Sequence, residues 1–358
     1  MPSDSPNALD PSADVGDLTR AVVDVRSVSG EERVLADLVE AALRGCAHLE
    51  VVRDGDAVIA RTRLGHAERV VLAGHLDTVP AAANFPGRLE GDVLHGLGSA
   101  DMKGGVAVAL HLAATLSAPT RDVTYVFYDG EEVEAERNGL LRVARRSPDL
   151  LAADFAVLME PTDGAVEGGC QGTLRVEVRT TGTRAHSARA WLGDNAIHAL
   201  APLLERLGSY EPRRPVVDGL EYHEGLQAVR VEGGVAGNVV PDEAVLTVNH
   251  RFAPDRSEAE ALAHVREVFD GYDVVVIDSA AAARPGLDHR SARAFVDAVG
   301  GRPRAKHGWT DVARFAQLGI PAVNYGPGDP RFAHRSDEHV SLEQVRDVAR
   351  RVRAWLTA

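Results

Sequence analysis

The segment that decides the fold reads VVLAGHLD, residues 70–77. Its four consecutive apolar residues, Val70–Ala73, are typical of a strand buried on both faces, and such strands occur in parallel sheets covered by helices. An imidazole and a carboxylate follow at His75 and Asp77. Because ligands of open α/β sheets gather beyond the carboxyl ends of the strands, the segment predicts both a buried strand and the place of a site.

Apolar runs of similar length recur along the chain and alternate with helical segments. This alternation is typical of an α/β sheet. The expected strands are Val70–Ala73, Val123–Tyr128, Phe155–Met159 and Ile320–Tyr325, and the expected helices are Gly104–Leu116 and Ser341–Trp355. Acidic or His residues follow the strands, so we expect a site at the edge of this sheet.

Three Ser residues lie three positions before a Glu or Gln, which is the spacing of an N-terminal capping box. The pairs are Ser29 with Glu32, Ser257 with Glu260, and Ser341 with Gln344. We therefore expect helices to begin at these three serines.

The middle of the chain has a different pattern, with alternating strands and two helices. The expected strands are Leu174–Thr180, Gln227–Glu232, Ala244–Phe252 and Tyr272–Ile277, with one helix near Asn195–Leu207 and another after Ser257. We predict an α/β catalytic domain of residues 15–172 and 285–358, interrupted by a smaller α+β domain of residues 173–284. Residues 1–14, rich in Pro, Ser and Asp, are expected to form a loose tail.

Composition excludes several classes of partner. The chain has 53 acidic and 39 basic residues and a formal net charge of −14, with no basic block, so we expect no nucleic-acid partner. No apolar stretch reaches membrane-spanning length, and no signal peptide is visible, so we expect no membrane partner. Two cysteines are too few for a disulfide framework, and a reducing cytoplasm fits best.

Metal-ligand residue types follow several expected strands or lie in glycine-rich turns. They are His75, Asp101, Glu131, Glu132, Glu160 and His334. Two imidazoles with several carboxylates suit zinc, and a shared Asp could bridge two ions. The adjacent Glu131 and Glu132 point in different directions, so one can bind metal while the other acts as a base.

Taken singly, each of these signals has an ordinary explanation. A His-x-Asp after a strand is more often surface polarity, and a Glu-Glu pair is usually solvated. The joint occurrence at several strand ends, each in a turn or glycine-rich context, favours the metal site over both explanations.

At these residues the sequence resembles the co-catalytic zinc amidases and exopeptidases, which include acetylornithine deacetylases, succinyl-diaminopimelate desuccinylases, aminoacylases and glutamate-releasing carboxypeptidases. The motifs that carry the resemblance are GHLDTVP (74–80), GSADMKGG (98–105), Glu131-Glu132, Glu160-Pro161, AHSAR (185–189) and Gly326-Pro327-Gly328 before His334. The resemblance covers nearly the whole chain and implies a three-layer catalytic domain with a ferredoxin-like lid or dimerisation domain.

The resemblance implies a role for each residue of the centre. Asp101 would bridge two zinc ions, for which cobalt can substitute. One site would be completed by His75 and Glu160, and the other by Glu132 and His334. Glu131 would be the general base. Asp77 would orient His75 through its second ring nitrogen, a role that the His-x-Asp spacing itself also suggests.

The smaller domain would pair subunits into a homodimer, and His186 would stabilise the oxyanion in the partner's site. The family's substrate-binding positions match Asn238 and Arg251, and a planar guanidinium suits a substrate carboxylate. Arg189, Thr310, Asp311 and Arg314 are further candidates for the same pocket. For both His186 and Arg251, an ordinary exposed residue is the alternative interpretation.

Residues 128–139, YDGEEVEAERNG, look most similar to one subtype of the desuccinylases. The resemblance therefore implies hydrolysis of an N-succinyl amide of diaminopimelate. The alternative is an acetylornithine deacetylase or another N-acyl-amino-acid amidohydrolase or dipeptidase with the same metal chemistry. A binding protein without catalysis would be expected to have lost a ligand or the base, and all are present here.

Overall fold

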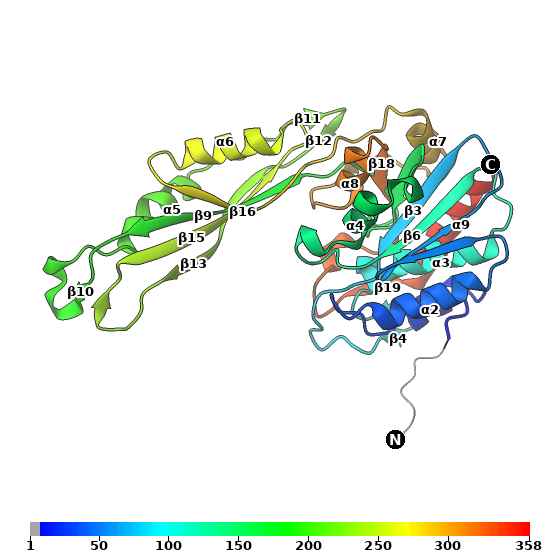
Figure 1. The fold of residues 1–358 in the computed structure, drawn as a ribbon, viewed down its shortest axis with the longest axis horizontal. Helices are drawn as coiled ribbons and strands as arrows, with labels where there is room; N and C mark the ends of the chain where they lie inside the picture. Colours follow the sequence, from blue (N-terminus) through cyan, green and yellow to red (C-terminus); the bar gives the residue numbers. More distant parts are fainter. Residues whose placement is uncertain (1–7) are drawn as a thin grey trace, which may run out of the picture. The chain divides into compact units, whose positions relative to one another are not determined.

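The computed structural model describes residues 8–358 and divides the chain into two compact units (Figure 1). Unit 1 comprises residues up to Gly168 together with Pro285–Arg304 and Arg314–Ala358. Unit 2 comprises Gly169–Arg284 and Ala305–Ala313. Residues 305–313, expected with the catalytic domain, thus cluster with the inserted unit.

Unit 1 is built on an eight-stranded mixed sheet in the order β1-β2-β6-β3-β7-β18-β8-β17. The strands are β1 (Glu50–Asp54), β2 (Ala57–Arg61), β3 (Arg69–His75), β6 (Asp122–Tyr128), β7 (Phe155–Leu158), β8 (Glu167–Gly168), β17 (Arg304–Ala305) and β18 (Ala322–Asn324). Strands β6, β3, β7 and β18 run parallel, so their carboxyl ends meet at one edge. The central strand β3 is buried along nearly its whole length, as its apolar run predicts.

Helices cover the sheet (Figure 1). They are α1 (Val15–Val23), α2 (Arg33–Arg44), α3 (Gly104–Thr115), α4 (Gly139–Arg146), α7 (Arg290–Val299), α8 (Val312–Gln317) and α9 (Leu342–Thr357). Apolar residues of α1, α2, α3, α7 and α9 form one core cluster with alternate residues of the strands. The buried Leu140 and Val143 of α4 lie outside this cluster, and α4 contacts β2.

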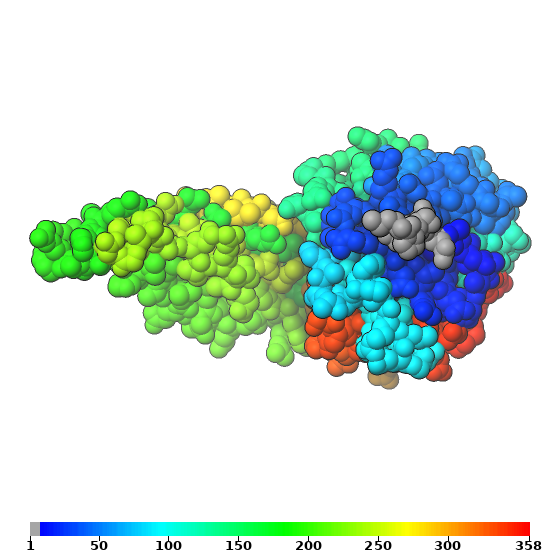
Figure 2. All heavy atoms as spheres, turned by 90° about the horizontal axis from the view of Figure 1, so that it is seen from below, coloured from blue at the N-terminus to red at the C-terminus, as the bar shows by residue number. Residues whose placement is uncertain are grey.

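A three-stranded sheet joins distant parts of unit 1. Its order is β19 (His339–Ser341), β5 (Val93–His95), β4 (Arg88–Glu90). In Figure 2 the segment around β4 and β5 (cyan) lies against the C-terminal part of the chain (orange to red). This pairing brings the segment after β18 to the start of α3. No helix within residues 8–358 has the length and apolarity needed to cross a membrane.

Unit 2 has the βαββαβ order of a ferredoxin-like fold. Its elements are β9 (Gly172–Thr181), α5 (Ala201–Gly208), β13 (Gly225–Gly233), β15 (Glu243–Phe252), α6 (Glu258–Val268) and β16 (Val274–Ala280). The sheet order is β13-β15-β9-β16, antiparallel throughout. Two short ladders complete the unit, β10 (Ala185–His186) with β14 (Val239–Val240) and β11 (Val216–Val217) with β12 (Leu220–Glu221).

Two of the three predicted helix caps are confirmed and one is wrong. Ser257 forms a complete capping box with Glu260, and the Ser341 side chain accepts a hydrogen bond from the backbone of Gln344. Helix α2 instead begins at Arg33 without a side-chain cap. The Ser29 hydroxyl donates to the carboxylate of Asp77, 2.8 Å away. This carboxylate is buried and needs donors, so the hydroxyl bonds to it and does not cap the N-terminus of α2.

The expected loose tail is wrong in its second half, and residues 1–7 lie outside the described part. Leu9 is buried in the core cluster of unit 1. Asp14 caps α1 by accepting from the backbone of Gly16, and it pairs with Arg346 of α9 at 2.8 Å. The segment before α1 is therefore packed onto the domain.

Candidate metal centre

The ligand-type side chains converge at the carboxyl edge of the parallel strands. His75 ends β3, Glu131 and Glu132 follow β6, and Glu160 lies two residues beyond β7. The two remaining candidates come from loops. Asp101 lies in the irregular turn before α3, and His334 lies in the segment between β18 and β19.

His75 is held from both ring nitrogens and is almost completely buried. Its Nδ1 lies 3.0 Å from the backbone oxygen of Asp77 and 3.5 Å from the carboxylate of that residue. Its Nε2 lies 3.3 Å from Oδ1 of Asp101. Asp77 thus orients the imidazole mainly through its carbonyl group, and Nε2 faces the centre.

The carboxylate of Asp101 lies between two imidazoles. Its Oδ1 faces His75, and its Oδ2 lies 3.5 Å from Nε2 of His334. The same Nε2 of His334 lies 2.7 Å from Oε1 of Glu132. Each oxygen of Asp101 therefore belongs to a different cluster, as a bridging carboxylate requires.

Among residues 8–358, three groups of side chains bring ligand atoms within 4.8 Å of one another. They are His75 with Asp101 and Glu160, Asp101 with Glu132 and His334, and His75 with Glu131 and Glu132. The first two groups share Asp101 and contain all five predicted ligands. The structure therefore brings these ligands together around two adjacent positions.

Charge in the centre favours a cation. Hydrogen bonds to Asp101 and Glu132 raise the pKa of His334 to about 10. Burial opposes protonation of His75, but hydrogen bonds with Asp101 and Asp77 outweigh it and raise the pKa of this imidazole. Burial would raise the pKa of Asp101, yet its bonds to His334 and His75 lower it. Carboxylate oxygens thus face both imidazoles, an arrangement that favours a bound cation, and the nitrogen and oxygen donors fit zinc.

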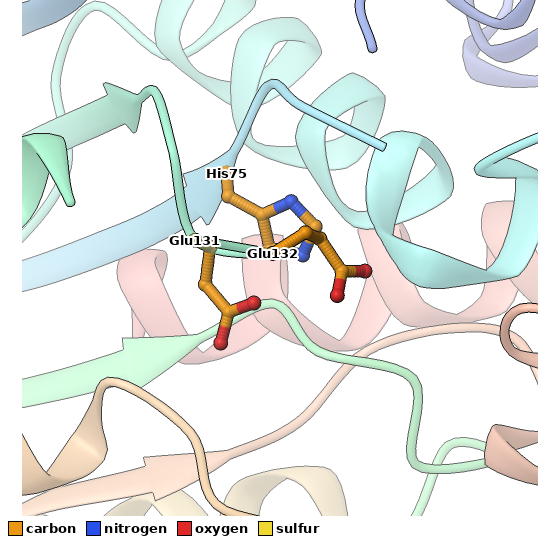
Figure 3. A group of neighbouring side chains, drawn as sticks. All are labelled: His75, Glu131 and Glu132. Carbon is orange, nitrogen blue, oxygen red and sulfur yellow. The ribbon is translucent and has the colours of Figure 1, made fainter. Parts of the chain in front are cut away.

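Glu131 and Glu132 leave the same loop with their carboxylates pointing apart (Figure 3). The loop is fixed by buried Asp77, which accepts hydrogen bonds from the backbone N–H groups of both residues at 3.0 Å. Glu32, also buried, accepts from Gly130 N at 3.2 Å. The sequence predicted that Asp77 orients His75, but it did not indicate that Asp77 also holds the loop of Glu131 and Glu132.

Ser29 and Glu32 are therefore residues of the site that the sequence led us to place in a helix cap. A Ser-x-x-Glu sequence can form a capping box or can hold a distant loop, and the spacing is the same in both cases. Only the partner that each side chain contacts in the folded protein distinguishes the two roles. The signal that could have found Ser29 is the carboxylate of Asp77, which is buried two residues beyond β3 and needs several donors.

The remaining candidates lie mostly in unit 2. His186 and Arg189 are exposed, and His186 Nδ1 accepts from the backbone of Ala188 at 3.0 Å. Asn238 lies close to His186, because its backbone oxygen accepts from Ser187 N at 2.9 Å. Arg251 is exposed on β15.

Two further predicted contacts are buried. Thr310 belongs to unit 2, where its carbonyl oxygen accepts from the Cys170 thiol, 3.6 Å away. Arg314 belongs to unit 1, on α8. Burial raises the pKa of Cys170 to about 11, and within residues 8–358 this thiol belongs to none of the groups of ligand-type side chains.

Comparisons with known proteins give the family and the fold of this chain. The family model "Peptidase family M20/M25/M40" matches residues 71–358. The "Putative succinyl-diaminopimelate desuccinylase DapE" of Mycobacterium tuberculosis is 58% identical over 351 residues, covering 97% of this chain and 99% of the relative. The succinyl-diaminopimelate desuccinylase of Corynebacterium glutamicum is 47% identical, with both chains covered completely. A tripeptidase structure from Staphylococcus aureus shares the fold at 19% identity, with a TM-score of 0.79 and 98% of each chain covered.

Proposed function

The chain belongs to peptidase family M20/M25/M40, and on that premise we propose that it hydrolyses N-succinyl-LL-2,6-diaminopimelate to succinate and LL-2,6-diaminopimelate. The observation that carries the proposal is the 58% identity to a relative of that name over almost the whole chain. A strand-end cluster with every predicted ligand supports it. The reaction would serve lysine and diaminopimelate biosynthesis in the cytoplasm.

Two zinc ions are the proposed cofactors, with cobalt as a substitute. His75, Asp101 and Glu160 would hold one ion, and Asp101, Glu132 and His334 the other, which uses the two groups around the shared carboxylate. When bound, such ions supply Lewis-acid activation of the scissile carbonyl and of the attacking water. The zinc assignment rests on the mixed imidazole and carboxylate donors.

Glu131 is the proposed general base. Its carboxylate lies beside His75 and points away from the carboxylate of Glu132 (Figure 3). It would take a proton from water and pass it to the leaving nitrogen. Asp77 would keep Glu131 in place, because it holds the backbone N–H at 3.0 Å.

Unit 2 is the proposed dimerisation and lid domain. Its sheet ends in β13 and β16, and exposed Val231 and Ile277 on these edge strands support pairing with a second copy. His186 of one subunit would stabilise the oxyanion in the other. Arg251 and Asn238, with Arg189, Thr310 and Arg314, would bind the substrate, and Arg251 would take a carboxylate.

Parallel hydrolysis assays test the proposal. Metal-loaded protein is given N-succinyl-diaminopimelate in one reaction and N-acetylornithine in another, and release of the free amine is measured. We expect strong preference for the succinyl compound. Preference for the acetyl compound would replace the proposed substrate while keeping the metal chemistry, and inactivity on both would overturn the proposal.

Glu131→Ala gives the test of the base. Turnover should fall by about 10²–10⁴-fold, the usual contribution of a positioned acid or base. Metal content should stay at the wild-type level, because the five proposed ligands remain. Unchanged turnover would remove Glu131 from this role.

A further inference from the structure

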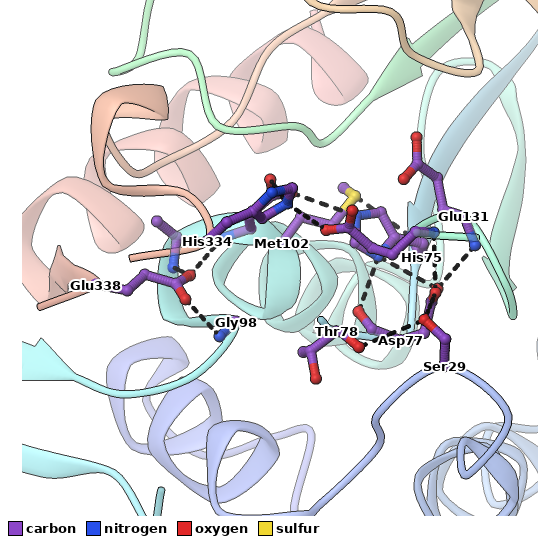
Figure 4. Close-up of polar contacts among 12 residues, drawn as sticks. Ser29, His75, Asp77, Thr78, Gly98, Met102, Glu131, His334 and Glu338 are labelled. Atoms are coloured by element: carbon purple, nitrogen blue, oxygen red, sulfur yellow. Dashed lines mark hydrogen bonds and ion pairs between the residues drawn. The ribbon is translucent and has the colours of Figure 1, made fainter. Parts of the chain in front are cut away.

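A buried carboxylate outside the ligand set holds the turn that carries Asp101. Glu338 is 1% exposed, and its Oε1 accepts hydrogen bonds from the backbone N–H groups of Ala100 and Asp101, both at 3.0 Å. Its Oε2 accepts from Gly98 N at 2.9 Å (Figure 4). Three N–H groups of one irregular turn thus end on a single side chain, in a place where no helix or strand pairs them.

The same residue lies in the segment that carries His334. Only three residues separate them, and the backbone oxygen of Glu338 accepts from Gly96 N at 3.1 Å just before β19 begins. His334 has a left-handed backbone with a φ of +63°. An L-residue keeps that conformation only when its surroundings hold it, so the position of His334 depends on how this segment is anchored.

These contacts join two ligand loops that meet across the centre. His334 Nε2 lies 3.5 Å from Asp101 Oδ2, although 233 positions of sequence separate the two residues. Neither residue lies on a strand of the central sheet. Their spacing must therefore be set by contacts between the loops, and Glu338 supplies three of these contacts to the Asp101 turn.

We propose that Glu338 is a positioning residue that fixes Asp101 relative to His334 and thereby sets the affinity of the metal position formed by Asp101, Glu132 and His334. The proposal rests on the proposed dinuclear function. The other position depends less on Glu338, because His75 ends β3 and Glu160 lies two residues beyond the end of β7.

The chemistry of the side chain makes the proposal testable with an isosteric change. A carboxylate accepts at both oxygens, whereas the amide of glutamine accepts at one and donates at the other. In Glu338→Gln, the amide nitrogen would face an N–H donor of the turn, and one of the three bonds would become a clash of donors. The turn would have to move, with little change in side-chain volume.

Asp337→Asn is the matched control. Asp337 is the neighbour of Glu338 in the same segment and carries the same charge, but its exposed carboxylate pairs with Arg335 at 2.7 Å. The control removes an equal charge near the centre without touching the Asp101 turn. A difference between the two variants therefore reports position and not net charge.

The experiment titrates metal-free protein with Co²⁺ and follows the absorption of the bound ion, with metal content measured after dialysis. Wild-type protein and Asp337→Asn should bind two ions. Glu338→Gln should keep one ion and bind the second about 10–100-fold more weakly, the usual effect of losing a group that orients a ligand. Excess metal should restore turnover in this variant.

Two results would overturn the proposal. One is a second-ion affinity of Glu338→Gln equal to that of the wild type. The other is equal weakening in Asp337→Asn. If Glu338→Gln does not fold, Glu338→Asp replaces it, because the shorter carboxylate cannot reach all three donors and should weaken the second ion in the same way. Wild-type protein that binds fewer than two ions would instead contradict the dinuclear site itself.

Discussion

The two halves of the metal centre are held in different ways. His75 and Glu160 belong to strand ends and are 1% and 4% exposed. His334 comes from a loop, its side chain is half exposed, and its backbone is left-handed. His75 and Glu160 form the strand half of the centre, and the sheet sets the position of their backbone.

The loop half, with Glu132 and His334, depends on buried carboxylates outside the proposed ligand set. Asp77 and Glu32 hold the loop of Glu131 and Glu132, and Glu338 holds the turn of Asp101. Each of these carboxylates collects backbone N–H groups that no regular element satisfies. The sheet thus sets the backbone position of the strand residues, with Asp77 orienting the ring of His75, whereas Asp101 and Glu132 lie on segments that buried carboxylates hold.

The largest expected effect comes from the residue that the two halves share. Asp101→Ala removes one oxygen from each cluster, so both ions should bind more weakly and turnover should fall by about 10³-fold or more, as for loss of several kcal/mol of transition-state stabilisation. Metal analysis after dialysis checks this. Asp56→Ala, which breaks a half-buried ion pair with Arg53 outside the candidate centre, is the control and should keep both ions.

Loss of only one ion from Asp101→Ala would contradict this division of the centre into two halves that share a ligand. It would mean that Asp101 belongs to a single half and that the ions do not share a carboxylate.

A pH series sharpens the difference between the halves. The pKa of His334 is about 10 in the metal-free protein, because its imidazole is hydrogen-bonded to Asp101 and Glu132. A metal ion must displace that proton, so affinity for the loop-half ion should rise about tenfold per pH unit between pH 6.5 and 10 for one released proton. Calorimetry in buffers of different ionisation enthalpy measures the proton release.

The stability of the metal-free protein changes with pH in the opposite direction to its metal affinity. A raised pKa means that protonation of His334 stabilises the metal-free fold fully below pH 6.5, and this contribution is lost as the pH rises through about 10. Affinity for metal and stability of the metal-free protein should therefore move in opposite directions. A metal affinity independent of pH in this window would show that His334 is not the group displaced.

A smaller effect is expected from Ser29→Ala. The hydroxyl donates to Asp77 at 2.8 Å, and Asp77 in turn holds Glu131 and Glu132. Removing this bond should lower kcat by about tenfold, as for other groups that orient a ligand or base, with little change in KM. The melting temperature is measured in parallel, and a loss of stability with unchanged kcat would return Ser29 to a purely structural role.

Much of the fold and of the centre could be predicted because burial leaves a readable pattern. The apolar run before His75 identifies a central strand, and the edge rule then places Glu131, Glu132 and Glu160 near it. The β1–β2 hairpin was missed, because its short strands, five residues each, carry charged residues among the apolar ones.

The supports of the centre could not be predicted in the same way. Glu32 and Glu338 accept hydrogen bonds from backbone N–H groups far away in sequence, and every residue type except Pro offers such a group. Ser29 donates to the carboxylate of Asp77, 48 positions away, which no local spacing indicates. Glu338 lies 237 positions from its partner Asp101. At Ser29 the local spacing predicted a helix cap, but α2 has no side-chain cap.

The smallest expected effect separates a true cap from an apparent one. Ser257→Ala removes the cap of α6, where the Ser257 side chain accepts from Glu260 N and the Glu260 side chain accepts from Ser257 N. The free energy of unfolding should fall by about 1 kcal/mol, the usual loss for an N-cap, while kcat and metal content stay at wild-type values.

Denaturant unfolding of both serine variants gives the contrast. Since α2 has no side-chain cap, Ser29→Ala should lose turnover in excess of any change in stability, and Ser257→Ala should lose stability alone. Equal profiles for the two variants would show that Ser29 does not support the catalytic loop.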